Sequence, residues 1–121
     1  MNPAWEILLL AGGGALGSAL RGWLGERFAT LLPWTTLFIN VTGSFAAGWL
    51  AAQTTGKPGE EWLWAFGLVG ICGGYTTFST MAFQSLVMWR ERRGGRLVFY
   101  LAVTLALGLG AAWAGLAAGA K

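Results

Sequence analysis

The chain has 121 residues, of which 55 % are hydrophobic and 11 % are charged, and its net charge is +3. The charged share is about half that of a soluble domain, which favours a single all-α, membrane-embedded domain over residues 1–121. One cysteine, no histidine and five acidic residues exclude an intrachain disulfide, a cysteine metal cluster and a catalytic triad, so we do not expect an enzyme.

Long uncharged stretches divide the chain into membrane spans. Residues 28–56, 62–89 and 97–120 carry no charge, and each stretch exceeds the roughly 20 residues that cross a bilayer core. The uncharged stretch near the N-terminus is shorter and is long enough only if Arg21 is tolerated within or at the end of its span. We therefore predict four spans, at residues 4–25, 34–53, 62–89 and 97–119.

The first span carries glycines at a spacing that favours close helix packing. Gly13 and Gly17 form a GxxxG pair, and Gly115 and Gly119 repeat that spacing in the fourth span. We expect these faces to mediate oligomerisation, most often two-fold. Arg21 either extends to the membrane interface or donates hydrogen bonds to carbonyls of another segment.

Asn40 is the notable polar residue of the second span. A side-chain amide at membrane depth needs hydrogen-bond partners. It either holds the helices together through an interhelical hydrogen bond or presents an amide donor to a polar pathway.

The third span contains a stretch that is unsuited to a continuous helix. Residues 70–80 hold three glycines and four hydroxyl side chains besides Tyr75, and Gly73 and Gly74 expose backbone polar groups. Non-helical backbone at membrane depth occurs only against protein or along a cavity. We predict a helix broken near residues 73–78 that serves function; the alternative is that the small residues only allow close packing.

Charges outside the spans predict the topology. The first and third loops carry most of the basic residues, which places these loops in the cytoplasm and both termini outside. Lys57 and Lys121 lie on the opposite side. The arginines are better explained as topology signals than as a nucleic-acid site. They are Arg21, Arg27, Arg90, Arg92, Arg93 and Arg96.

Polar residues within the spans favour an anion over a cation as the permeating ion. No Asp or Glu lies in the middle of a span, as a cation pathway or proton-coupled transporter usually requires. Amide and hydroxyl donors suit an anion, as does the positive edge of a phenylalanine ring. Carbonyls exposed near Gly73 could also hold a cation structurally. The candidate residues are Asn40, Thr76, Thr77, Phe78, Ser79, Thr80, Tyr100 and Thr104.

Several motifs resemble the CrcB/Fluc fluoride channels. The string from Gly73 to Thr80 (Gly-Gly-Tyr-Thr-Thr-Phe-Ser-Thr), preceded by Gly70, resembles the broken third helix of that family. Residues 38–45 resemble its second-helix asparagine motif, and residues 13–25 look like its first-helix pattern. The similarity extends over nearly the whole chain and includes the layout of four spans.

The resemblance implies a multi-pass channel in the plasma membrane of a prokaryote that exports fluoride passively and so protects the cytoplasm. It implies an antiparallel, dual-topology homodimer in membrane lipid, with two pores and a central sodium ion. Asn40 would donate its amide to fluoride, and Phe78 would be the first residue of the family's phenylalanine box. Tyr100 and Thr104 would lie on the polar track of the fourth helix.

The resemblance also implies a sodium site, to which Gly73 and Thr76 would supply backbone carbonyls. Arg21 and Gly74 are assigned structural roles. The remaining candidates for lining the pore are hydroxyl side chains near the break: Thr77, Ser79 and Thr80.

Three positions depart from the family pattern. Met81 stands where the family has its second box phenylalanine, so the ring quadrupole is absent there. Gln84 stands where a glutamate is usual, and Thr35 stands where a glycine is usual. The excess of basic residues in the first and third loops favours one fixed orientation in the membrane. The alternative to the homodimer is therefore a pair with an oppositely oriented paralogue.

Two other functions are compatible with a short chain of four spans. A proton-coupled exporter of the small multidrug-resistance type needs a carboxylate in its first span, where Glu6 is the only candidate and lies near the terminus. A purely structural membrane subunit would conduct nothing.

Overall fold

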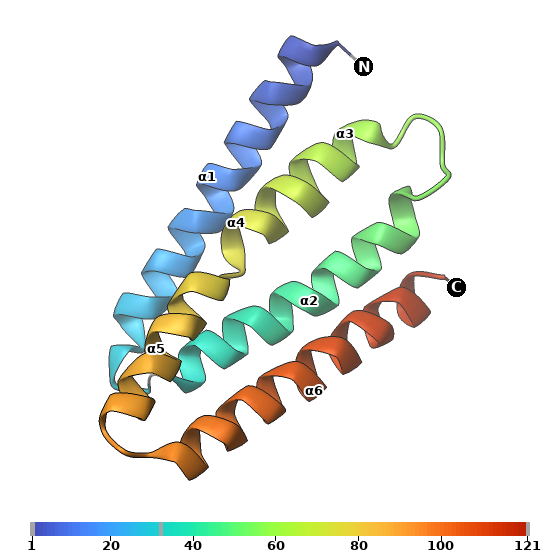
Figure 1. The fold of residues 1–121 in the computed structure, drawn as a ribbon. Coiled ribbons are helices and arrows are strands. Elements are labelled where there is room, and N and C mark those ends of the chain that lie inside the picture. Colours follow the sequence, from blue (N-terminus) through green and yellow to red (C-terminus); the bar gives the residue numbers. More distant parts are fainter. Residues whose placement is uncertain (1, 32, 121) are drawn as a thin grey trace.

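The computed structural model describes residues 2–31 and 33–120, and every regular element in these ranges is helical. Lys121, placed above on the outer side, lies outside the described residues. Figure 1 shows the elements in chain order. They are α1 (Pro3–Arg27), η1 (Ala29–Leu31), α2 (Trp34–Thr54), α3 (Glu61–Leu63), η2 (Trp64–Cys72), α4 (Gly73–Tyr75), α5 (Phe78–Arg90) and α6 (Gly94–Gly119).

The two outer helices have the length and composition of membrane spans. α1 and α6 are both long and apolar enough to cross a bilayer, and only 11 % and 6 % of their apolar stretches is buried. A core helix of a soluble protein would be mostly buried, so these surfaces suit lipid. Helix α2 and the interrupted third segment, from α3 to α5, lie beside them (Figure 1). The predicted all-helical architecture with an interrupted third helix is confirmed.

Glycines bring α1 and η2 into backbone contact. A Cβ built at Gly17 would overlap the carbonyl oxygen of Ile71 and lie 2.8 Å from the nitrogen of Tyr75. A Cβ at Gly13 would lie 3.0 Å from the Cα of Gly70. Only glycine permits this approach, which lets two backbones pack without side chains between them.

The same spacing brings α6 against α2. A Cβ at Gly115 would overlap the carbonyl oxygen of Phe45, and one at Gly119 would lie 2.7 Å from the Cβ of Ala52. The GxxxG pairs of α1 and α6 are therefore used inside the protomer. The expectation that these faces mediate oligomerisation is wrong.

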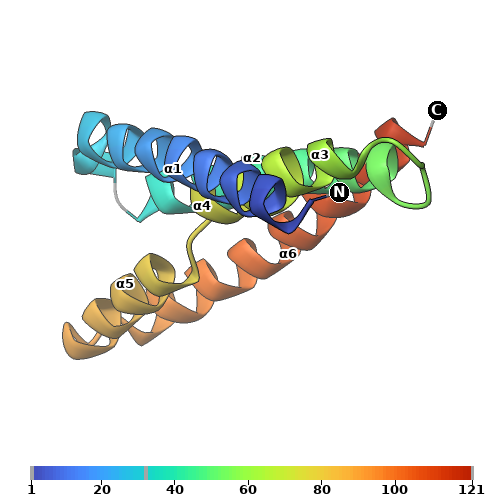
Figure 2. The same cartoon turned by 90° about the horizontal axis from the view of Figure 1, so that it is seen from above.

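The break in the third segment lies at Thr76 and Thr77. Both residues are extended, with φ/ψ of −76°/156° and −146°/119°, whereas Gly73 stays helical at −64°/−39°. The break is thus within the predicted range but past the glycines. Residues 64–72 of η2 form a π-helix, a rare form that is often found at functional sites. Figure 2 shows that the chain turns away from α1 after α4, and that α5 then runs beside the first half of α6.

Candidate functional site

Asn40 forms a two-bond clamp on the break. Its Nδ2 donates to the carbonyl oxygen of Thr77 at 3.0 Å, and its Oδ1 accepts from the backbone nitrogen of Thr77 at 2.8 Å. The side-chain amide thus replaces the backbone partners that Thr77 would have in a helix. An asparagine amide has two N–H groups, so one donor remains beyond the bond to Thr77. Both interpretations of Asn40, as a link between helices and as a donor, are compatible with this geometry.

Thr77 also begins the helix that follows the break. Its Oγ1 accepts from the backbone nitrogen of Thr80 at 3.1 Å, which makes it the N-cap of α5. The same oxygen lies 3.1 Å from Thr80 Oγ1 and 3.3 Å from Ser79 Oγ. Thr77, Ser79 and Thr80 therefore form one cluster of hydroxyl groups, in which Thr77 is buried and Ser79 is exposed.

The carbonyls of Gly73 and Thr76 are among those that lose their helical donors at the break. In a continuous α-helix, Gly73 O would accept from Thr77 N–H, and Thr76 O would accept from Thr80 N–H. Thr77 N–H donates to Asn40 instead, and Thr80 N–H donates to Thr77 Oγ1. The carbonyls of Gly73 and Thr76 are thereby left for other partners, as hard oxygen ligands of the kind that alkali and alkaline-earth cations take.

Arg21 and Ser18 hold the carbonyl of Gly74. Arg21 Nε donates to Gly74 O at 3.1 Å, and Ser18 Oγ donates to it at 3.3 Å. Arg21 is partly buried, and this contact corresponds to the second of its two interpretations, a bond to a carbonyl of another segment. A Cβ at Gly74 would overlap the carbonyl oxygen of Gly14, so α1 and α4 meet at their backbones here.

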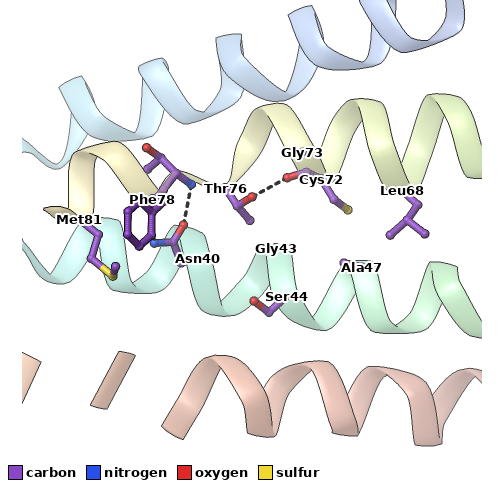
Figure 3. A pocket seen from close by; sticks show the side chains of 11 residues that line it. Asn40, Gly43, Ser44, Ala47, Leu68, Cys72, Gly73, Thr76, Phe78 and Met81 are labelled. Atoms are coloured by element: carbon purple, nitrogen blue, oxygen red, sulfur yellow. Dashed lines mark hydrogen bonds between the residues drawn. The ribbon is translucent and has the colours of Figure 1, made fainter. Parts of the chain in front are cut away.

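A cavity of about 430 Å³ opens beside the break. Figure 3 shows Asn40 and Phe78 at one end of it and the third segment along its side. Phe78 is 77 % exposed, so its ring is available to a partner or an ion. The lining residues are Asn40, Gly43, Ser44, Ala47, Leu68, Cys72, Gly73, Thr76, Thr77, Phe78 and Met81.

A second cavity, of about 280 Å³, lies on the other side of the clamp. It is bordered by earlier residues of α2, including Thr36, and by Arg21 of α1. Thr77 lines both cavities, and Thr80 joins it in the second. The clamp therefore separates two hollows that follow each other along α2.

A chain of side-chain hydrogen bonds crosses the bundle next to the second cavity. Gln84 Nε2 donates to Thr36 Oγ1 at 2.9 Å, and Tyr100 Oη donates to Gln84 Oε1 at 3.0 Å. Tyr100 is fully buried and lines none of these cavities. Thr104 Oγ1 is enclosed and has no hydrogen-bond partner among the described residues. Tyr100 and Thr104 therefore lie apart from the hydroxyl cluster at the break.

The structure adds three residues that were not among the candidates. Ser44 and Cys72 line the first cavity, and Thr36 lines the second and bonds Gln84. Ser44 lies four positions after Asn40, and Thr36 lies four before it. One face of α2 therefore carries Thr36, Asn40 and Ser44. That spacing was the available signal.

Comparison with known proteins gives the family. The sequence model described as "CrcB-like protein, Camphor Resistance (CrcB)" matches residues 8–116. A fluoride-specific ion channel FluC of Xanthomonas axonopodis pv. citri is 42 % identical over 120 residues, which cover 93 % of this chain and 90 % of that protein. A protein of the same name from Rhizobium meliloti is 39 % identical over 117 residues, with 93 % and 94 % covered. The chain therefore belongs to the CrcB/FluC family of membrane channels.

Proposed function

We propose that the chain is a fluoride-selective ion channel that lets fluoride leave the cytoplasm of a bacterium passively across the plasma membrane. The proposal is supported by the relatives, which are named fluoride-specific ion channels. The observation that carries it in this chain is the Asn40 clamp, which leaves an amide donor between two cavities. The cavity beside Phe78 has no carboxylate among its described lining residues, which suits an anion.

The proposed route follows α2 past the break. Fluoride is a small anion and a strong hydrogen-bond acceptor, so it exchanges water for neutral donors. Several weak sites allow conduction better than one tight site, because the ion must also leave. Asn40 supplies the amide and Phe78 a ring edge, while Met81 supplies an apolar wall. The hydroxyl donors of this route at the break are Thr77, Ser79 and Thr80, and Tyr100 and Thr104 of α6 are proposed for a further part of the route, outside the two cavities.

We further propose that two copies of this 1–121 domain form an antiparallel dimer within the lipid. Phe78 and Phe83 are 77 % and 65 % exposed on the same short helix, and a partner would cover them. An oppositely oriented paralogue is the alternative partner.

A structural sodium ion fits the break. The carbonyls of Gly73 and Thr76 lack their helical donors, and carbonyl oxygens are suitable ligands for a hard cation. When bound, sodium would supply positive charge that holds carbonyl dipoles of the break together. The residues that would hold it are Gly73 and Thr76.

The proton-coupled exporter has no observation in its favour. Glu6 lies in the first turn of α1, far from the centre of that 25-residue helix. A carboxylate that exchanges protons during transport must lie at depth.

The test is ion-selective-electrode efflux from liposomes that hold the purified protein, with fluoride compared against chloride. We expect rapid fluoride release with chloride retained, and a loss of about fivefold or more in Asn40→Ala, since about 1–3 kcal/mol of stabilisation is removed at the clamp. Gln53→Ala is the matched control, because Gln53 is another α2 amide that bonds a backbone carbonyl, that of Gly119, at 2.9 Å. Absent fluoride release from folded wild-type protein would refute the proposed function.

A further inference from the structure

A third cavity, of about 410 Å³, lies between the end of α5 and the start of α6. Its charged lining residues are Arg93, Arg96 and Glu91. These belong to the loop and helix ends at one end of the molecule, where the chain turns from α5 into α6 (Figure 1).

The charge of this cavity is positive. Arg93 Nε pairs with Glu91 Oε2 at 3.5 Å, and both side chains are about half exposed, so this pair is weak and screened by water. Arg96 forms no ion pair within residues 2–31 and 33–120. Two arginines against one glutamate leave a net positive charge at the mouth of the cavity.

This cavity shares lining residues with the cavity next to the clamp. Thr80 and Gln84 line it, and both also line the cavity that Thr77 borders. Thr77 in turn lines the cavity of Asn40. Shared polar lining residues therefore link the cavity of Arg93 and Arg96 to that of Asn40, through a middle cavity that also holds Arg21 and Glu26.

We infer that Arg93 and Arg96 form an anion-collecting mouth that raises the local concentration of fluoride before it reaches Thr80 and Gln84. This inference rests on the proposed function and deepens it. A cleft lined by one sign of charge speeds association by about 10- to 1,000-fold, and a cleft with an excess of one sign, as here, gains less; the gain falls with ionic strength. A lipid phosphate would find the same charge, but the inward hydroxyl and amide lining favours a small anion.

The experiment measures fluoride efflux at subsaturating fluoride in liposomes of neutral phosphatidylcholine, with the impermeant salt at about 10 mM or about 1 M, where the Debye length is about 30 Å or about 3 Å. We expect Arg96→Gln and Arg93→Gln to slow efflux about threefold or more at low salt and to match wild type at high salt. Arg96→Lys should keep most of the wild-type rate.

The control is Arg90→Gln, which removes an exposed arginine from the last turn of α5 that does not line this cavity. Its efflux should fall less than that of the Arg93 and Arg96 variants at low salt, because Arg90 lies outside the cavity, and should match wild type at high salt. An equal loss in Arg90→Gln would assign the effect to general surface charge and overturn the inference. So would unchanged efflux of the Arg93 and Arg96 variants at low salt in phosphatidylcholine, with a loss that appears only when the measurement is repeated in liposomes of anionic lipid. If wild type itself releases no fluoride, the proposed function fails instead.

Discussion

Gln84 joins two hydroxyl groups that are buried inside the bundle. It donates to Thr36 and accepts from Tyr100, whose ring is fully enclosed. An amide can do both at once, whereas an apolar side chain can do neither. The position is therefore constrained by hydrogen bonding.

We expect Gln84→Leu to destabilise the protein by about 1–3 kcal/mol, because the hydroxyl of Tyr100 is left buried without a partner. Gln84→Glu should be tolerated, since the Thr36 hydroxyl can turn to donate and the carboxylate can accept from both hydroxyls. Thermal unfolding in detergent measures the difference. Equal stability of Gln84→Leu and wild type would show that this hydrogen-bonded chain contributes nothing.

Residue chemistry predicts that Asn40 needs partners but does not name them. The partner, Thr77, is 37 positions away, and the contact depends on where the third helix breaks. The sequence also leaves Arg21 open between two interpretations, because a snorkelling arginine and a carbonyl-bound one have the same flanking pattern. Only the distance of 3.1 Å from Arg21 Nε to Gly74 O separates them.

At the scale of elements, the contact between α1 and η2 depends on glycine. We expect Gly17→Ala to destabilise the fold by about 1–3 kcal/mol, since its Cβ would overlap the Ile71 carbonyl and force the backbones apart. Gly14→Ala is the matched control, because a Cβ there meets nothing within 4 Å. The comparison fails if both variants unfold at the same temperature in detergent.

The turn between α5 and α6 holds the described chain's one non-glycine residue with positive φ, Arg92 at 58°. Arg93 N–H donates to Met88 O at 2.8 Å, so Arg92 occupies the left-handed position at which helices usually end with glycine. Arg92→Gly should therefore stabilise the protein by about 1 kcal/mol. Arg92→Ala removes the same charge but keeps the Cβ, and should give no gain in unfolding temperature. A higher unfolding temperature in both variants would show that removal of the charge, and not of the Cβ, stabilises the protein.

The lengths of the uncharged stretches predict the positions of the spans, and the glycine content of the third span predicts the region of the break. The exact break does not follow, because Gly73 and Gly74 can remain helical while Asn40 offers Thr77 a better partner. The GxxxG prediction fails for a related reason. A glycine face specifies a close neighbour, but the neighbour can belong to the same chain, as Gly17 and Ile71 show.

For the whole molecule, the exposed surface is apolar along the helices and basic at one end. Exposed tryptophan, leucine and phenylalanine side chains cover α1 and α6, as expected for helices in lipid. Arg27, Arg90 and Arg96 mark the end at which the first and third loops lie. An antiparallel dimer would place one such end on each side of the membrane, so each side would receive one arginine-lined mouth.

A substitution at Gly73 can test the proposed dimer and sodium site without disturbing the fold of the protomer. A Cβ at Gly73 meets no heavy atom within 4 Å, and the residue is exposed, so the protomer should tolerate a larger side chain. A second copy that approaches the carbonyls of Gly73 and Thr76 should not. We therefore expect Gly73→Val to keep its helical circular dichroism but to lose sodium-dependent dimerisation. Its rate of fluoride efflux should fall at least tenfold.

Gly110→Val controls for added bulk, because Gly110 is equally open and exposed but lies on α6 and lines none of the cavities described above. Cross-linking in detergent with sodium or with an organic cation, followed by efflux from liposomes, gives the two readouts. If Gly73→Val dimerises and conducts like wild type, the carbonyls at the break do not form the contact between copies, and Phe78 and Phe83 must be covered by another surface. If dimerisation is lost in Gly73→Val alone, the break that Asn40 holds open is also the place where two protomers meet.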